Sequence, residues 1–108
     1  MAGKAGLDYM LKVSASVPLD VRFMLSSCVP ASPFESSGAT LAAEDLEPYF
    51  QNERVLGLAE VMDVPAVLSG NEDMLKKLAL ARIYGKVVDG HAPLLFGPEL
   101  AAYAAAGV

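Results

Sequence analysis

The only histidine of the chain, His91, and an acidic residue within an apolar run, Glu60, are the two side chains best placed to do chemistry. His91 follows two β-branched residues and lies between Gly90 and Pro93, a pattern typical of a short buried strand that turns into a loop. Glu60 lies near the end of the apolar run 55–62, where an unpaired carboxylate is costly. Because the carboxyl ends of parallel strands meet at one edge of a sheet, the two side chains could form half of a metal site.

Both residues also allow an ordinary structural interpretation. A single histidine near a strand end is more often a hydrogen-bonded structural residue than a metal ligand. Glu60 could lie at an exposed edge position or form an ion pair with Arg54 or Lys86. Asp89 lies two residues before His91, on the same side of a strand, and could either support a ligand or remain a solvated charge.

The elements that must position these residues follow from the apolar runs and from the spacing of apolar residues. Three apolar segments are predicted to be strands, near residues 20–28, 54–62 and 86–91. Helices are predicted for residues 1–16, 41–51, 71–85 and 97–107. Pro48 is expected to shorten or kink the second of these helices. Loops are predicted for residues 29–40, which are rich in proline and serine, and 63–70, which centre on Pro65.

The alternation of helices and strands predicts the fold class. Strand starts lie about 30 residues apart, which is the size of one βα unit. This pattern predicts an α/β fold with a parallel three-stranded sheet and right-handed crossovers, with residues 1–108 forming a single segment. The helix 71–85 is predicted to begin at Asn71 as its N-cap. Its predicted buried stripe consists of Leu75, Leu78, Ala79 and Ile83.

The composition argues against several classes of function. The chain carries 8 Lys and Arg against 13 Asp and Glu, a net charge of −5, and has no basic cluster. Nucleic acids and anionic membranes are therefore not expected partners. The most apolar tract, 92–108, is too short and too broken by proline and glycine to cross a membrane. The only cysteine, Cys28, is expected to be a buried thiol in a reducing compartment, most simply the cytoplasm.

The predicted loop 29–40 is long for a compact domain, and such loops are more often functional than idle. Its only acidic residue, Glu35, is therefore a candidate contact for a substrate or a ligand. Plain exposure or helix capping is the simpler interpretation of this carboxylate.

Two short runs carry a specific resemblance to a known family. They are Ser-Cys-Val-Pro-Ala at residues 27–31 and Asp-Gly-His-Ala-Pro at residues 89–93. Together with residues 57–62 and 99–108, they resemble the third-, fourth- and fifth-strand segments of bacterial adenine deaminases. The resemblance covers nearly the whole chain. It implies a (β/α)8 TIM barrel of the metal-dependent amidohydrolase superfamily, of which this chain would supply about three βα units.

The resemblance also implies an activity. The family hydrolyses adenine to hypoxanthine and ammonia with water activated by manganese or iron, in a site expected to be binuclear. By this resemblance Glu60 is the strand-four carboxylate that bridges metals, and His91 is the strand-five metal ligand. Glu35, Asp63 and Asp89 are the positions expected to contact substrate or to support the ligands. Asp63 departs from the family, which more commonly has asparagine there, and this departure affects a substrate loop.

The family's remaining ligands have no counterpart in this sequence. They are a His-x-His in strand one, a histidine in strand six and an aspartate in strand eight. A complete barrel takes about 250 residues, so no complete catalytic set is expected and the isolated chain should be inactive.

The leading hypothesis is therefore a central segment of an adenine deaminase. The alternative is a non-catalytic, stand-alone α/β module that binds a partner or itself through open sheet edges. A small flavodoxin-like sheet is a third interpretation. The open edges predict self-association.

Overall fold

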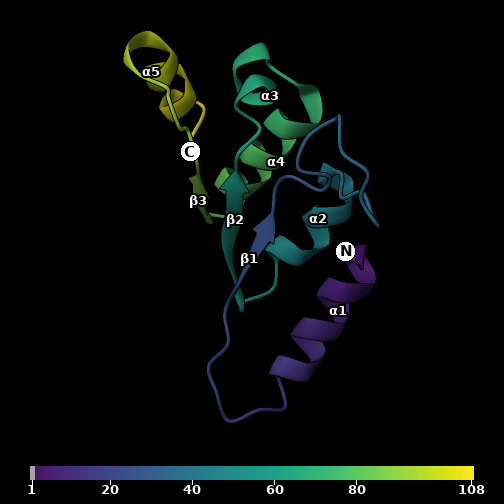
Figure 1. Ribbon diagram of the computed structural model, residues 1–108. Helices are drawn as coiled ribbons and strands as arrows, with labels where there is room; N and C mark the ends of the chain where they lie inside the picture. Colours follow the sequence, from purple (N-terminus) through teal and green to yellow (C-terminus); the bar gives the residue numbers. More distant parts are fainter. Residues whose placement is uncertain (1) are drawn as a thin grey trace.

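The computed structural model describes residues 2–108. These residues form a three-stranded sheet with helices packed around it (Figure 1). The strands are β1 (Phe23–Ser26), β2 (Val55–Val61) and β3 (Val87–Gly90). The helices are α1 (Gly3–Ser14), α2 (Ala43–Phe50), α3 (Val64–Ser69), α4 (Glu72–Ile83) and α5 (Gly97–Ala105). None of the helices formed by residues 2–108 combines the length and the apolarity that crossing a bilayer requires.

The sheet has the order β1-β2-β3, and both neighbouring pairs are parallel. The prediction of a parallel, three-stranded α/β sheet is therefore confirmed. The first strand is shorter than the predicted 20–28. Pairing with β2 ends at Ser27, whose N–H donates to the Ala59 carbonyl at 3.1 Å. Beyond it, the Val29 carbonyl accepts from the Leu41 N–H at 3.0 Å, so the chain there pairs with the segment before α2 rather than with β2.

The core lies between the sheet and the helices α2 and α4, which pack together on one face (Figure 1). Leu25 of β1 and Leu58 of β2 are paired in register, and both are completely buried. Leu46 and Phe50 of α2 are buried against the same cluster. Burial of each such side chain stabilises the fold by about 1.5–3 kcal/mol, so this layer fixes the positions of the strands and of the residues that follow them.

The predicted loop 63–70 is wrong, because these residues form the short helix α3. The Asp63 carboxylate accepts from the Ala66 N–H at 3.0 Å and caps the first turn. Pro65 lies in that turn, where its missing N–H costs no helical hydrogen bond. Gly70 ends the helix with φ 76°, a left-handed conformation that glycine adopts without a steric penalty. The Pro65 that suggested a loop is therefore part of a helix start.

The predicted buried face of α4 is also partly wrong, although Asn71 caps the helix as predicted. The buried residues are Met74, Lys77, Leu78 and Ala81. Leu75 is 42% exposed and Ile83 73% exposed. The face is rotated because the Lys77 ammonium can be buried: it donates to the Ser27 carbonyl at 2.9 Å and pairs with the Asp73 carboxylate at 2.7 Å.

Helix α1 is attached to α2 by polar contacts at its amino-terminal half. The Tyr49 hydroxyl donates to the Asp8 carboxylate at 2.8 Å, and the Lys4 ammonium pairs with Asp45 at 2.8 Å. Partial burial, with help from the Asp8 carboxylate, raises the pKa of Tyr49 to about 12.

This raised pKa predicts a loss of stability in alkali. Neutral Tyr49 is favoured in the folded state, so its contribution is complete below the unfolded pKa of about 10 and falls as the pH rises toward about 12. Urea unfolding of the parent chain and of Tyr49→Phe at about pH 9 and about pH 11 tests this. The parent should lose more free energy of unfolding between the two pH values than the phenylalanine variant, and equal losses would contradict the assignment.

Candidate functional site

The carboxyl ends of β2 and β3 lie side by side and bring three of the candidate residues to one edge of the sheet. Val61 and Gly90 are paired in register, and the His91 N–H donates to the Val61 carbonyl at 3.1 Å. Glu60 therefore lies at the same edge as Asp89 and His91, and all three side chains are exposed. A carboxylate and an imidazole at one strand edge are oxygen and nitrogen donors that suit a first-row divalent metal.

Glu60 does not follow the regular geometry of a strand. Its φ is 53°, and the register between β2 and β3 shifts between Leu58 and Val61. Its N–H donates to the Asp89 carboxylate at 2.9 Å, and its carbonyl accepts from the Ser27 hydroxyl at 3.0 Å. The irregular backbone explains how a glutamate in an apolar run leaves its carboxylate in solvent.

The basic residues that could have paired with Glu60 are engaged elsewhere. The Lys86 ammonium donates to the carbonyls of Val55 and Asn52, at 2.6 Å and 3.3 Å. The Arg54 guanidinium donates to the Ser14 carbonyl at 3.3 Å. Of the two structural interpretations that the sequence left open, exposure is therefore the one observed for Glu60.

The carboxylates of Asp63 and Glu35 form no hydrogen bond to Glu60, Asp89 or His91. The Asp63 carboxylate is used as the N-cap of α3. The Glu35 carboxylate is exposed and accepts from the Ser32 hydroxyl at 3.4 Å, a contact within its own segment. Across residues 2–108, no three or more His, Cys, Asp or Glu side chains gather closely enough to hold a metal ion. The structure thus gathers Glu60, Asp89 and His91 at one edge but does not complete a metal site.

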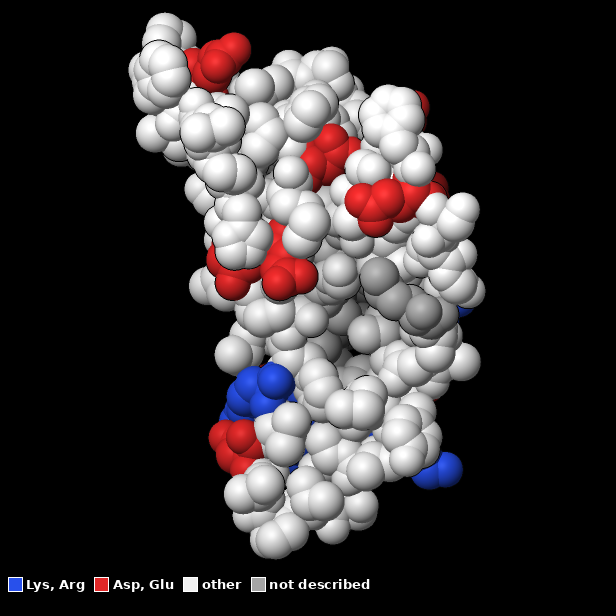
Figure 2. Space-filling view, in the orientation of Figure 1, with Lys and Arg blue, Asp and Glu red and all other residues white. Residues whose placement is uncertain are grey.

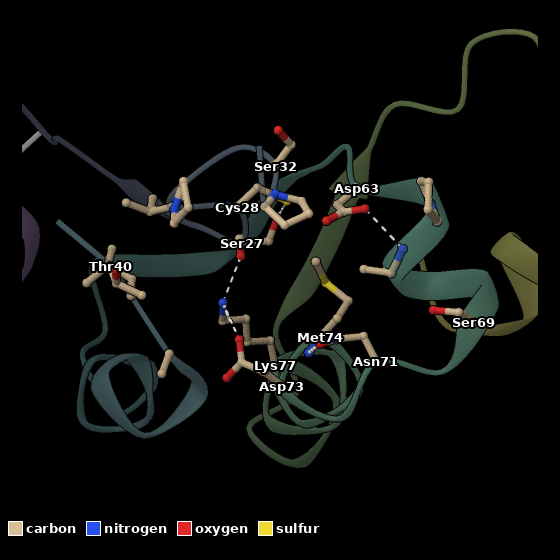
Figure 3. A pocket seen from close by; sticks show the side chains of 17 residues that line it. Ser27, Cys28, Ser32, Thr40, Asp63, Ser69, Asn71, Asp73, Met74 and Lys77 are labelled. Atoms are coloured by element: carbon tan, nitrogen blue, oxygen red, sulfur yellow. Dashed lines mark hydrogen bonds and ion pairs between the residues drawn. The ribbon is translucent and has the colours of Figure 1, made fainter. Parts of the chain in front are cut away.

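A pocket of about 690 Å³ lies where the chain leaves β1, and Glu60, Asp89 and His91 do not line it (Figure 3). Asp63 lines it, as do the buried thiol of Cys28 and the side chains of Met74 and Asn71. Figure 3 shows Lys77 rising from α4 between Asp73 and Ser27, with both interactions marked. The burial of Cys28 agrees with its expected behaviour as a small apolar residue.

Sequence reasoning missed Lys77 and Ser27, which connect this pocket to the strand edge. Lys77 is 4% exposed and Ser27 is 1% exposed, so both polar side chains are buried. The spacing of Asp73 and Lys77, four residues apart on one helix face, was an available indication of an ion pair. No sequence pattern indicated that the Ser27 hydroxyl would reach across to β2.

Charge is unevenly distributed over the face seen in Figure 2. Acidic side chains gather in its upper half, the half toward which the strands point in Figure 1, and the basic side chains lie in its lower half. One acidic group lies beside the basic group at the lower left. The carboxyl-terminal edge of the sheet is therefore the more negative end of this face, which favours the approach of a cation.

Comparison with known proteins gives relatives over the whole chain, although no protein-family model matches it. It is 55% identical over all 108 residues to an adenine deaminase of Clostridium acetobutylicum. It is 51% identical to adenine deaminase 2 of Carboxydothermus hydrogenoformans and 53% identical to an adenine deaminase of Nitratidesulfovibrio vulgaris, again over all 108 residues. In each case the match covers 19% of the relative, so the chain spans about a fifth of the length of these proteins.

Proposed function

We infer that this chain supplies part of an adenine deaminase, because over its whole length it corresponds to one segment of such enzymes. The observation that carries this inference is the identity of 50–55% to several adenine deaminases over 108 residues. The proposed reaction is the hydrolysis of adenine to hypoxanthine and ammonia, catalysed by the complete enzyme and not by this segment alone.

The proposed architecture is that this chain, as a single segment, forms part of a (β/α)8 barrel. The parallel order β1-β2-β3 and the placement of α2 and α4 on one face support this proposal. In a barrel the helices form the outer ring and the strands the inner wall. The residues at the carboxyl ends of the strands, Glu60 and His91 among them, would then face the active site.

The donor atoms present fit part of a site for manganese or iron. Glu60 and His91 would hold the metal, and a bound metal would supply Lewis-acid polarisation for hydrolysis. Two side chains leave the ligand set incomplete, so the other ligands would come from elsewhere in the enzyme. Asp89 would hold the Glu60 backbone, and Asp63 and Glu35 remain candidates for contact with adenine or with the ligands.

An exchange chimera tests the proposed function. In this chimera, the 108 residues replace the matched segment of the Clostridium acetobutylicum adenine deaminase. The two segments are 55% identical in sequence. With manganese or iron present, the chimera is expected to release ammonia from adenine, whereas the isolated chain should release none because its ligand set is incomplete. A well-folded chimera without activity, or an isolated chain with robust activity, would contradict the proposal.

A second candidate function rests on the open edges of the sheet. β1 and β3 each have one neighbour in the sheet that residues 2–108 form, and Val87 of β3 is 61% exposed. Unpaired strand edges are templates for association, so the chain could also bind a second copy of itself as a non-catalytic module.

Self-association is therefore expected for the purified chain. Light scattering should show dimers or larger species, and Val87→Lys should shift them toward monomer because lysine on an edge strand opposes pairing. Phe34→Lys is a matched control, since Phe34 is 96% exposed and lies outside the sheet. A monodisperse monomer at high concentration, or equal effects of the two lysines, would contradict association through the edge.

A further inference from the structure

Glu60 adopts a backbone conformation that a residue with a Cβ rarely adopts. Its φ of 53° lies in the left-handed region, and it shares this property with only one other non-glycine residue among residues 2–108, Leu94. Such a conformation persists only where the surroundings hold it. The burial pattern of β2 passes from half-buried Ala59 to exposed Glu60 and buried Val61, so the conformation decides where the carboxylate lies.

Two side chains hold the peptide groups of Glu60, one from each neighbouring strand. From β3, the Asp89 Oδ1 atom accepts from the Glu60 N–H at 2.9 Å. From the end of β1, the Ser27 Oγ atom donates to the Glu60 carbonyl at 3.0 Å. The ordinary partners of a strand residue are backbone groups, so both main-chain groups of Glu60 have a side-chain partner in their place.

Ser27 is itself fixed by the helix layer. Its N–H donates to the Ala59 carbonyl at 3.1 Å, and its carbonyl accepts from the Lys77 ammonium at 2.9 Å. Lys77 pairs with Asp73 on the preceding turn of α4, at 2.7 Å (Figure 3). Ser27 and Lys77 are almost completely buried, and these bonds connect the helix layer to the Glu60 backbone.

We propose that Ser27 and Asp89 are positioning residues for the Glu60 carboxylate. The inference rests on the proposed function in one respect, that Glu60 is a metal ligand. Asp89 acts through its hydrogen bond to the Glu60 N–H and not as a metal ligand. Ser27 is held by Lys77, which pairs with Asp73, and its hydroxyl holds the carbonyl group of Glu60. Removal of either bond releases Glu60 toward ordinary strand geometry and moves its carboxylate.

The first test needs neither metal nor activity. In nuclear magnetic resonance spectra of the isolated chain, the three-bond HN–Hα coupling of Glu60 reports its φ. Asp89→Ala and Ser27→Ala should move this coupling toward the value of an extended strand. Asp89→Asn should restore the parent value, because the amide oxygen still accepts the hydrogen bond. Unchanged couplings in both alanine variants would overturn the proposal.

The second test uses the exchange chimera and measures bound manganese and turnover of adenine. Asp89→Ala and Ser27→Ala should each lower metal affinity or activity about 10–100-fold, and Asp89→Asn should recover most of the loss. Asp20→Ala is the matched control, since Asp20 is an exposed aspartate that pairs with Arg22, outside the candidate site. If Asp89→Asn is as poor as Asp89→Ala, the carboxylate acts by its charge and the positioning role is wrong.

The two tests separate failure of this inference from failure of the proposed function. If Glu60→Gln leaves metal content and turnover undiminished, Glu60 is not a ligand and the proposed site fails. If Glu60→Gln removes activity while Ser27→Ala and Asp89→Ala leave metal affinity unchanged, the ligand stands and the positioning role alone is overturned.

Discussion

Glu60→Gln and His91→Ala, each introduced into the exchange chimera, are expected to abolish the turnover of adenine while leaving the protein folded. Glutamine keeps the size of glutamate but loses the charge with which a carboxylate binds a divalent cation. Alanine at position 91 removes the imidazole nitrogen. Each change should reduce turnover roughly 10³-fold or more, beyond the 10–100-fold typical of residues that only support a ligand.

The fold should tolerate both substitutions because neither side chain is buried. Glu60 and His91 are exposed, and the hydrogen bonds that fix them to the sheet involve their backbone groups. Surface substitutions of this kind usually change stability by less than about 0.5 kcal/mol. Ammonia release, bound metal and thermal unfolding should be measured on the same samples.

Glu53→Gln is a suitable control for the loss of one carboxylate. Glu53 is exposed and precedes β2, at the opposite end of the strand from Glu60. The Glu53→Gln substitution should leave the turnover of adenine unchanged. Full activity in either Glu60→Gln or His91→Ala would remove that residue from the metal site. Lost activity together with a lowered unfolding temperature would show that the effect comes from packing.

The strand order could be predicted from the sequence because a parallel sheet imposes a simple pattern. Apolar runs separated by helix-length segments are typical of parallel strands joined by crossovers, and right-handed crossovers place consecutive strands side by side. The same reasoning placed Glu60 and His91 at one edge, since both follow the apolar part of a strand. For these features, local sequence and global topology agree.

The features that could not be predicted depend on single long-range contacts. The buried face of α4 follows from a lysine that is buried by virtue of an ion pair with Asp73 and a hydrogen bond to Ser27, 50 residues away in the sequence. The left-handed Glu60 depends on the side chains of Ser27, which follows β1, and of Asp89 in β3. Helix α3 is a different case, because the relevant residues are close in the sequence. The spacing of Asp63, Pro65 and Gly70 is equally typical of a loop and of a short helix.

Gly57→Ala is expected to lower the stability of the fold strongly. A Cβ built at Gly57 overlaps the Val87 carbonyl oxygen and lies 2.8 Å from the Val87 carbonyl carbon. Favourable contact between carbon atoms begins at about 3.5 Å, and both atoms belong to the backbone, so no side chain can move aside. The strands β2 and β3 would have to separate, which would also disturb the neighbouring pair Leu58 and Val88.

The free energy of unfolding should therefore fall by about 3 kcal/mol or more, at the upper end of the costs of overpacking. Urea unfolding measures this loss, and Gly85→Ala is the matched control. Gly85 has φ 63° with no heavy atom within 4 Å of a built Cβ, so alanine there meets only the backbone penalty of roughly 1–2 kcal/mol. Because Gly57 lies outside the left-handed region, its larger cost would come from the close approach of two strands alone. Equal losses in the two variants would mean that β2 and β3 are farther apart than this structure places them.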